Sequence, residues 1–161
     1  MASTTFSGPV TSTAGFISGS DSLVTASAAT LTVTAASHAG RTVLLSKADG
    51  VTATLPAATG TGNTYSFFVN TAVTSNNDVI KVADATDVMT GRAYMLQDGG
   101  DTIVAFETAA DSDTITMDGS TTGGLKGNVV VCQDVATNTW AVTCHLSGTG
   151  TEATPFSASV S

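Results

Sequence analysis

The sequence SDTITMDGSTTGGLKGNVVVCQDVATNTWAV, residues 112–142, decides the fold. Its first part, Thr114 to Met117, alternates polar and apolar side chains, as a strand with one buried face does. The pair Asp118-Gly119 ends that strand with a turn signal. A glycine-rich connection then leads to residues 128–135, which are rich in valine and predict a second strand.

Residues 136–139 (ATNT) are typical of a tight turn, and residues 140–144 return beside the second strand. Two strands joined by so short a turn predict a β-hairpin. Trp140 lies on the returning strand and is the only tryptophan of the chain. We therefore expect this hairpin to anchor the hydrophobic core.

Cys132 and Cys144 lie on the two arms of the hairpin. If Val135 lies opposite Trp140, the period of two places one set of side chains on a single face: Val129, Val131, Val135, Trp140, Val142 and Cys144. Cys132 then points to the other face. A shift by one residue would pair the cysteines but separate those valines from the tryptophan. We predict two free thiols, with a disulfide as the alternative, and expect Trp140 to pack against Val131 or Val135.

The rest of the chain repeats this pattern of short apolar alternation between turn residues. Strands are predicted at residues 30–34, 41–46, 51–55, 64–69, 79–82, 92–96 and 102–106. Residues 84–90 are ambiguous and include a possible short helical turn. No exact repeat of solenoid length is present. Closely spaced strands with turns between them predict an all-β fold, an antiparallel β-sandwich or barrel with extended N- and C-terminal arms.

The chain divides into three parts on composition. We predict an extended N-terminal arm over residues 1–22, a β-sandwich body over 23–146 and a C-terminal tail over 147–161. Both ends are rich in Ser, Thr and Gly, and their apolar residues are too sparse to build a core. Six of these residues are predicted to bind a partner: Phe6, Val10, Phe16, Ile17, Pro155 and Phe156. The alternative is that the two ends fold back on their own subunit.

The charge of the chain argues against two classes of partner. The formal net charge is −8, and the five lysines and arginines are scattered along the sequence. Without a basic patch to neutralise phosphates, we expect no binding to nucleic acid. An anionic membrane surface would repel the chain for the same reason. The sequence also predicts no signal peptide and no membrane-spanning helix.

No motif of a known catalytic or cofactor site is present in the sequence. His38 and His145 are the only histidines, and neither lies in a nucleophile or metal motif. The spacing of Asp111, Asp113 and Asp118 does not fit a calcium-binding loop, so we interpret them as solvated loop carboxylates. We expect no enzyme activity and no cofactor, although a triad assembled from distant residues remains an alternative.

Two further segments have a structural and a functional interpretation. The glycines of Gly60-Thr61-Gly62 supply unusual backbone angles in a loop, and a phosphate cradle is the alternative. Tyr65, Phe67 and Phe68 are interpreted as core residues of a strand rather than as a platform on which a ligand stacks.

Four stretches resemble small structural proteins of tailed bacteriophages, especially marine ones. They are TTFSGPVTSTAGFISG (4–19), LPAATGTGNTYSFFVNT (55–71), DSDTITMDGSTTGGLKG (111–127) and GTGTEATPFSA (148–158). These motifs describe strands and turns and carry no active site. The resemblance implies a decoration or cement protein, often a homotrimer, that is bound to the major capsid protein on the outside of the head.

The resemblance and the composition lead to one expectation with one alternative. We expect a non-enzymatic virion structural protein that is made in the host cytoplasm and stabilises the capsid exterior. The acidic balance disfavours a position on the inner wall that faces DNA. The alternative is a tail fibre, spike or adhesin module that binds host-surface glycans.

Overall fold

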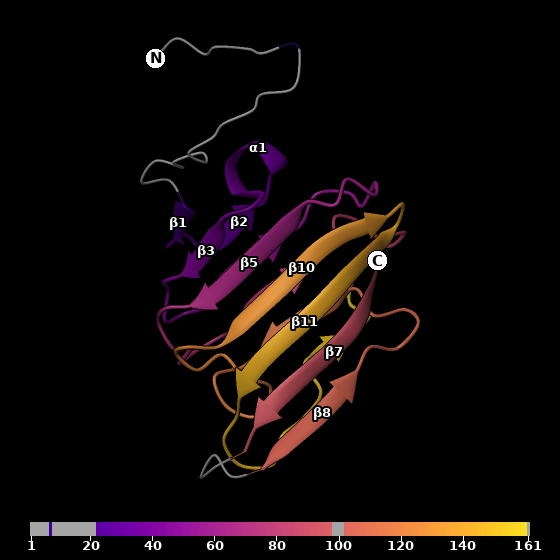
Figure 1. The fold of residues 1–161 in the computed structure, drawn as a ribbon. Helices are drawn as coiled ribbons and strands as arrows, with labels where there is room; N and C mark the ends of the chain where they lie inside the picture. Colours follow the sequence, from indigo (N-terminus) through magenta and orange to yellow (C-terminus); the bar gives the residue numbers. More distant parts are fainter. Residues whose placement is uncertain (1–6, 8–21, 98–101, 161) are drawn as a thin grey trace, which may run out of the picture.

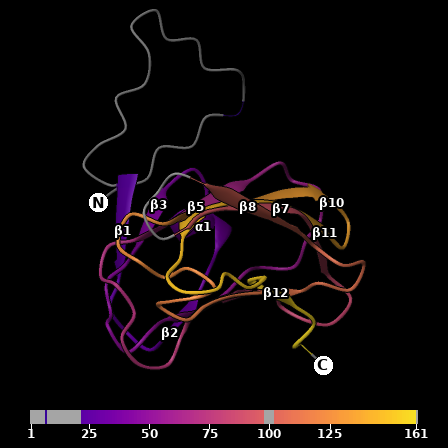
Figure 2. The ribbon, with the colours of Figure 1, turned by 90° about the horizontal axis from the view of Figure 1, so that it is seen from below.

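The computed structural model describes residues 7, 22–97 and 102–160, which form two β-sheets packed face to face (Figures 1 and 2). Sheet A has seven strands in the order β1 (Leu23–Ala26), β3 (Thr42–Leu45), β5 (Thr64–Val69), β10 (Val129–Ala136), β11 (Thr139–Ser147), β7 (Val88–Leu96) and β8 (Ile103–Glu107). Sheet B has five, in the order β12 (Phe156–Ser157), β9 (Thr114–Met117), β6 (Asp78–Lys81), β4 (Thr52–Thr54) and β2 (Thr30–Thr32). The short helix α1 (Ala35–His38) follows β2. The predicted all-β sandwich is confirmed.

The pairing of the strands is mixed rather than purely antiparallel. The chain alternates between the sheets from β1 to β6, so it runs in the same direction each time it returns to a sheet. Strands β1, β3 and β5 are therefore parallel in sheet A, and β2, β4 and β6 are parallel in sheet B. The later pairs are antiparallel except β11 with β7, which is parallel. The first half of the chain thus winds like a coil, although its sequence contains no exact repeat.

The core lies between the two inner faces, where side chains at alternate positions of each strand meet. One row crosses sheet A and consists of Val24, Val43, Phe67, Val130, Cys144, Ala93 and Phe106. A second row crosses sheet B and consists of Leu31, Ala53, Ile80, Ile115 and Phe156. Most of these side chains are buried in one continuous hydrophobic cluster. The interpretation of Tyr65 and Phe67 as core residues is confirmed, since both are 1% exposed, whereas Phe68 lies on the opposite face of β5 and is only half-buried.

The predicted hairpin forms, but its register differs from the expected one. Trp140 pairs with Asp134 rather than with Val135, because the ladder shifts between Asp134 and Ala136. Val135 is the extra residue of this β-bulge and is 47% exposed. The prediction that Trp140 packs against Val131 or Val135 is wrong. Its ring instead meets Tyr65 edge-on, with the ring centroids 5.6 Å apart.

The shifted register places both cysteines in the core. Cys132 pairs with Val142 and Cys144 with Val130, so both thiols point inward with Trp140. The expectation that Cys132 faces the opposite side is therefore wrong, whereas the prediction of free thiols is confirmed. Burial raises the pKa of Cys144 to about 12 and raises that of Cys132 well above its ordinary value. Both cysteines thus stay protonated and unreactive at neutral pH.

The C-terminal tail belongs to the sandwich of its own chain. Phe156 is 8% exposed and its strand β12 pairs with β9, at one edge of sheet B. The carboxylate of Asp113 then accepts hydrogen bonds from the backbone N–H groups of Ser159 and Val160, at 2.8 and 3.0 Å. The tail is therefore fixed on the body, and the expectation of an extended C-terminal arm is corrected.

We predict that Trp140→Ala lowers the free energy of unfolding by about 3–5 kcal/mol, because it leaves a cavity beneath the centre of sheet A. Denaturant-induced unfolding measures this change. Val135→Ala is the matched control in the same hairpin, with an expected change within about 0.5 kcal/mol because the bulge side chain is exposed. Equal unfolding midpoints for the parent and Trp140→Ala would contradict the assignment of Trp140 to the core.

Candidate assembly surface

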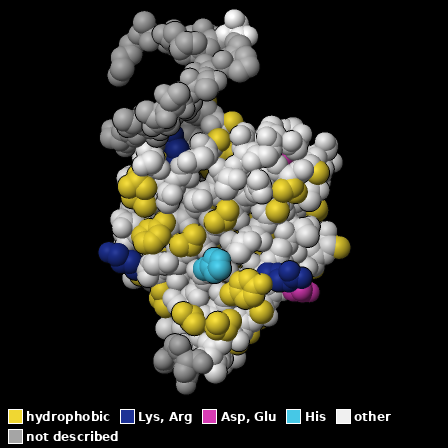
Figure 3. All heavy atoms as spheres, in the orientation of Figure 1, with side chains coloured by type: hydrophobic (Ala, Val, Ile, Leu, Met, Phe, Trp, Pro, Cys, Tyr) yellow, Lys and Arg dark blue, Asp and Glu magenta, His cyan; other side chains and the backbone are white. Residues whose placement is uncertain are grey.

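The outer face of sheet A carries an apolar patch near the ends of β7 and β11 and the start of β8. Of the five exposed large hydrophobic side chains in the described part of the chain, three lie here: Tyr94, Leu96 and Ile103, at 41%, 43% and 65% exposure. They line one surface hollow together with His145 and Leu146. We call Tyr94, Leu96, Ile103 and His145 the apolar patch, and Leu146, which is 4% exposed, belongs to the core beneath it. Figure 3 shows hydrophobic side chains gathered around a histidine on this face.

The composition of β7 explains the patch. Its last four residues, Ala93 to Leu96, are all apolar, so neither face of this end of the strand is polar. Ala93 and Met95 point inward and are fully buried. Tyr94 and Leu96 must then point outward, because successive side chains of a strand alternate between faces.

The register of sheet A brings the patch together across three strands. Leu96 lies opposite Ile103 of β8, and Tyr94 is level with His145 of β11. The Tyr94 and His145 rings stack at 26°, with centroids 6.0 Å apart. The hollow between these side chains has a volume of about 220 Å³, and a neighbouring one of about 270 Å³ extends from Leu96 to Lys126.

Among the residues that the structure describes, few charges lie near the patch. On the same face, Arg92 Nε donates a hydrogen bond to Glu107 Oε1 at 2.9 Å, so these two charges offset one another. Lys126 lines the neighbouring hollow and is exposed. A surface with exposed apolar side chains and few charges is typical of a site that another molecule covers.

The outer face of sheet B has a different chemistry. Its β2 and β4 strands present Thr30, Thr32, Thr52 and Thr54 in two adjacent rows. Threonine hydroxyls hydrogen-bond to water, whereas Leu96 and Ile103 of the apolar patch have no polar side-chain atom that could do so. The sandwich is therefore two-sided, with a hydroxyl face on sheet B and an apolar patch on sheet A.

The six residues predicted to bind a partner fall into two groups. Phe6, Val10, Phe16 and Ile17 lie outside the described residues. Pro155 and Phe156 are buried in their own sandwich, so neither presents its side chain to a partner.

Sequence reasoning missed the apolar patch, although the unbroken apolar run at the end of β7 was a signal for it.

The structure also accounts for the other residues that sequence analysis singled out. The loop of Gly60-Thr61-Gly62 holds an anion, but this anion is the carboxylate of Asp134. That carboxylate accepts the N–H groups of Thr59, Gly60 and Thr61 at 3.0, 2.6 and 3.0 Å. These N–H groups are therefore already occupied by Asp134, which argues against the alternative that the loop binds a phosphate.

Neither the acidic residues nor the histidines gather into a site. Asp113 holds the C-terminal tail, and Asp118 accepts N–H groups of its own loop, from Ser120 at 2.8 Å and Thr122 at 3.0 Å. Burial would raise the pKa of Asp118, but these bonds hold it at about 2. His38 is buried and its Nδ1 lies 3.0 Å from the Thr34 N–H. Over residues 22–97 and 102–160, no group of three or more His, Cys, Asp or Glu residues could hold a metal ion.

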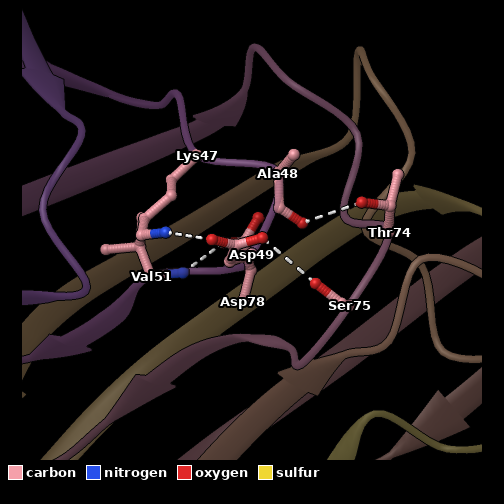
Figure 4. Close-up of polar contacts among 7 residues, drawn as sticks. All are labelled: Lys47, Ala48, Asp49, Val51, Thr74, Ser75 and Asp78. Atoms are coloured by element: carbon pink, nitrogen blue, oxygen red, sulfur yellow. Dashed lines mark hydrogen bonds and ion pairs between the residues drawn. The ribbon is translucent and has the colours of Figure 1, made fainter.

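One buried carboxylate is only half satisfied (Figure 4). Asp78 lies beneath the loop that joins β3 to β4 and is fully buried. Its Oδ1 accepts the N–H of Val51 at 2.8 Å, but its Oδ2 has no hydrogen-bond partner. Burial raises the pKa of Asp78 to about 6, against a smaller opposite effect of the Val51 hydrogen bond.

Asp49 in the same loop has the opposite environment. It is exposed, and it accepts hydrogen bonds from Lys47 Nζ at 2.7 Å and Ser75 Oγ at 3.1 Å. These two bonds lower its pKa. The ionisation of Asp49 in this loop and that of Asp78 beneath it thus affect folding in opposite directions.

Comparison with known proteins gives no family for this chain. No protein-family model matches the sequence, and searches of curated proteins and of solved structures found no significant match. In the part of the chain that the structure describes, no helix is long and apolar enough to span a membrane.

We predict that Asp78→Asn stabilises the protein at pH 7 and not at pH 4. The folded pKa of about 6 lies above the ordinary value of 3.8, so stability falls as pH rises between these values. The amide keeps an oxygen for the Val51 N–H but carries no charge. The expected gain at pH 7 is on the order of 1 kcal/mol, since the buried amide N–H₂ would itself lack an acceptor and offsets part of the gain.

Thermal unfolding of the parent and the variant from pH 4 to 8 measures the difference between them. Contributions from Asp113, Asp118 and Asp134 are the same in both proteins and cancel. Asp49→Asn is the matched control and should show no gain at pH 7, because its pKa is lowered. A difference in thermal stability between the parent and Asp78→Asn that stays constant across this pH range would contradict the raised pKa of Asp78.

Proposed function

We propose that this chain is a non-enzymatic virion structural protein that decorates and stabilises the outer surface of a tailed-phage capsid. The observation that carries the proposal is the apolar patch, which holds three of the five exposed large hydrophobic side chains among the described residues. Exposing Tyr94, Leu96 and Ile103 to water has a cost that a partner surface would remove. The partners proposed are the major capsid protein and further copies of this chain, as a homotrimer.

The two-sided chemistry of the sandwich supports an outer position. A protein on the head exterior needs one face that contacts protein and one that contacts water. Sheet A offers the first in its apolar patch, and sheet B offers the second in its threonine rows. A formal charge of −8 disfavours contact with DNA or an anionic membrane. The resemblance of four stretches to phage structural proteins points in the same direction.

A second function is favoured by one specific observation. The exposed, stacked rings of Tyr94 and His145 suit contact with the flat apolar side of a sugar ring. The alternative is therefore a tail fibre, spike or adhesin module that binds host-surface glycans. Its location distinguishes it, because such a protein lies at the tail tip rather than over the head lattice.

We predict that Leu96→Asp abolishes attachment to the heads of the phage that encodes the chain. A carboxylate buried in the contact without a partner costs several kcal/mol, so affinity should fall by about 100-fold or more. Co-sedimentation with heads stripped of the protein measures attachment, and antibody labelling of particles shows its location.

Thr32→Asp is the matched control, because it places the same charge on the hydroxyl face of sheet B. It should attach as the parent does. Unchanged attachment of Leu96→Asp would exclude the apolar patch as the contact. Labelling confined to the tail tip would favour the fibre or adhesin instead.

A further inference from the structure

The hollow in the apolar patch has the size and chemistry of a site for one protein side chain. Its volume of about 220 Å³ is below the ~300 Å³ at which sites for drug-sized molecules begin. Tyr94 and His145 supply the only polar side-chain groups among its five lining residues. A cofactor would need more room and several convergent polar groups. An apolar side chain of a partner needs only the contacts that are present.

The N-terminal arm contains apolar side chains of this kind. Residues 4–20 include no charged side chain, and Phe16-Ile17 is their one adjacent pair of large apolar residues. A segment without charge can lie against the patch without leaving an unpaired ion at the contact. Burying a phenylalanine or an isoleucine contributes about 1.5–3 kcal/mol each, which helps to offset the entropy lost when the arm is ordered.

The arm of the same subunit cannot place Ile17 at the β8 side of the patch. Six residues separate Ile17 from Leu23 at the start of β1, and a straight chain spans at most about 22 Å over that length. Strand β8 lies six strand spacings from β1, which is about 29 Å. Ile103 is also four residues further along the strand direction than Leu23, so the separation is about 32 Å.

Each edge strand of sheet A carries an exposed apolar side chain. Leu23 on β1 is 57% exposed and Ile103 on β8 is 65% exposed, and these strands are the opposite edges of one sheet. If β1 of one copy lies near β8 of the next, its Phe16 and Ile17 come within reach of the patch. Such a contact joins two different surfaces and closes into a ring when the rotation between copies permits it.

We propose that the apolar patch of one subunit binds Phe16 and Ile17 of a second copy of this chain, in a head-to-tail contact between β8 and β1. The inference rests on the proposed function only in taking the chain as an assembly protein. It names the occupant of the hollow and the direction of the contact.

Disulfide cross-linking in the full chain tests this contact. One variant carries Ile17→Cys and a second carries Ile103→Cys, and the two are mixed and mildly oxidised. A bond forms only if the two Cα atoms come within about 7 Å, which the distance estimate excludes inside one chain. We expect a mixed dimer on a non-reducing gel, and its loss when Leu96→Asp is added to the Ile103→Cys chain.

Three controls make the result specific. The parent should give no cross-link, because both native thiols are buried and have raised pKa values. Ile17→Cys mixed with Thr32→Cys, on the hydroxyl face of sheet B, should give none either. Sedimentation velocity of each variant before oxidation shows whether it keeps the oligomeric state of the parent.

Two outcomes would overturn the inference. Equal yields of mixed dimer from Ile103→Cys and from Thr32→Cys would mean that the chains cross-link by random collision and not at a specific contact. Dimers of Ile103→Cys with itself, without any mixed dimer, would mean that two β8 edges meet around a two-fold axis. Head attachment is measured separately, so its failure together with a positive cross-link would reject the capsid role and keep the contact between copies. Head attachment without the cross-link would keep the capsid role and reject the contact between copies.

Discussion

Buried aspartate carboxylates hold the loops of this sandwich in place, and the rest of the fold depends on them. A chain that winds between two sheets must cross from one to the other at each turn, and the crossing segments leave backbone N–H groups without strand partners. Asp134 accepts three such groups from the loop that precedes β5. Asp87 accepts the N–H of Ala58, and Asp113 accepts two from the C-terminal tail. Each carboxylate joins segments that lie far apart in the sequence.

This constraint separates the roles of the two outer faces. Because side chains inside the sandwich fix the loops and the tail, neither outer face is needed to hold the fold together. Sheet B can present threonine rows to water, and the end of sheet A can present Tyr94, Leu96 and Ile103. An exposed apolar patch on a body that is already complete is free to contact a partner. The same argument explains why Phe156 is not available for such a contact, since it closes the core beside Ile115.

The sequence predicts local structure here better than it predicts long-range arrangement. Strands such as Thr114–Met117 follow from alternation, because burial of one face imposes a period of two on each strand separately. Parallel pairing depends on which sheet the next strand joins, and no short window contains that information. The register of the hairpin was missed because valine at position 135 is apolar on either face, so the pattern cannot reveal a bulge. The patch was missed for a related reason: apolar residues on both sides of β7 are typical of a fully buried strand as well as of a contact surface.

The placement of the carboxylates also changes the meaning of the acidic composition. A formal charge of −8 implies a surface that repels further copies of the same chain. Asp78, Asp87, Asp113 and Asp134 are buried, however, and each accepts at least one backbone N–H from a segment far away in sequence. Their charge is balanced locally by aligned backbone dipoles rather than projected from the outer faces. On sheet A, Arg92 and Glu107 offset each other beside the patch. Among the described residues, the outer face around the patch is therefore close to neutral, so their charges do not oppose an apolar contact with a second copy there.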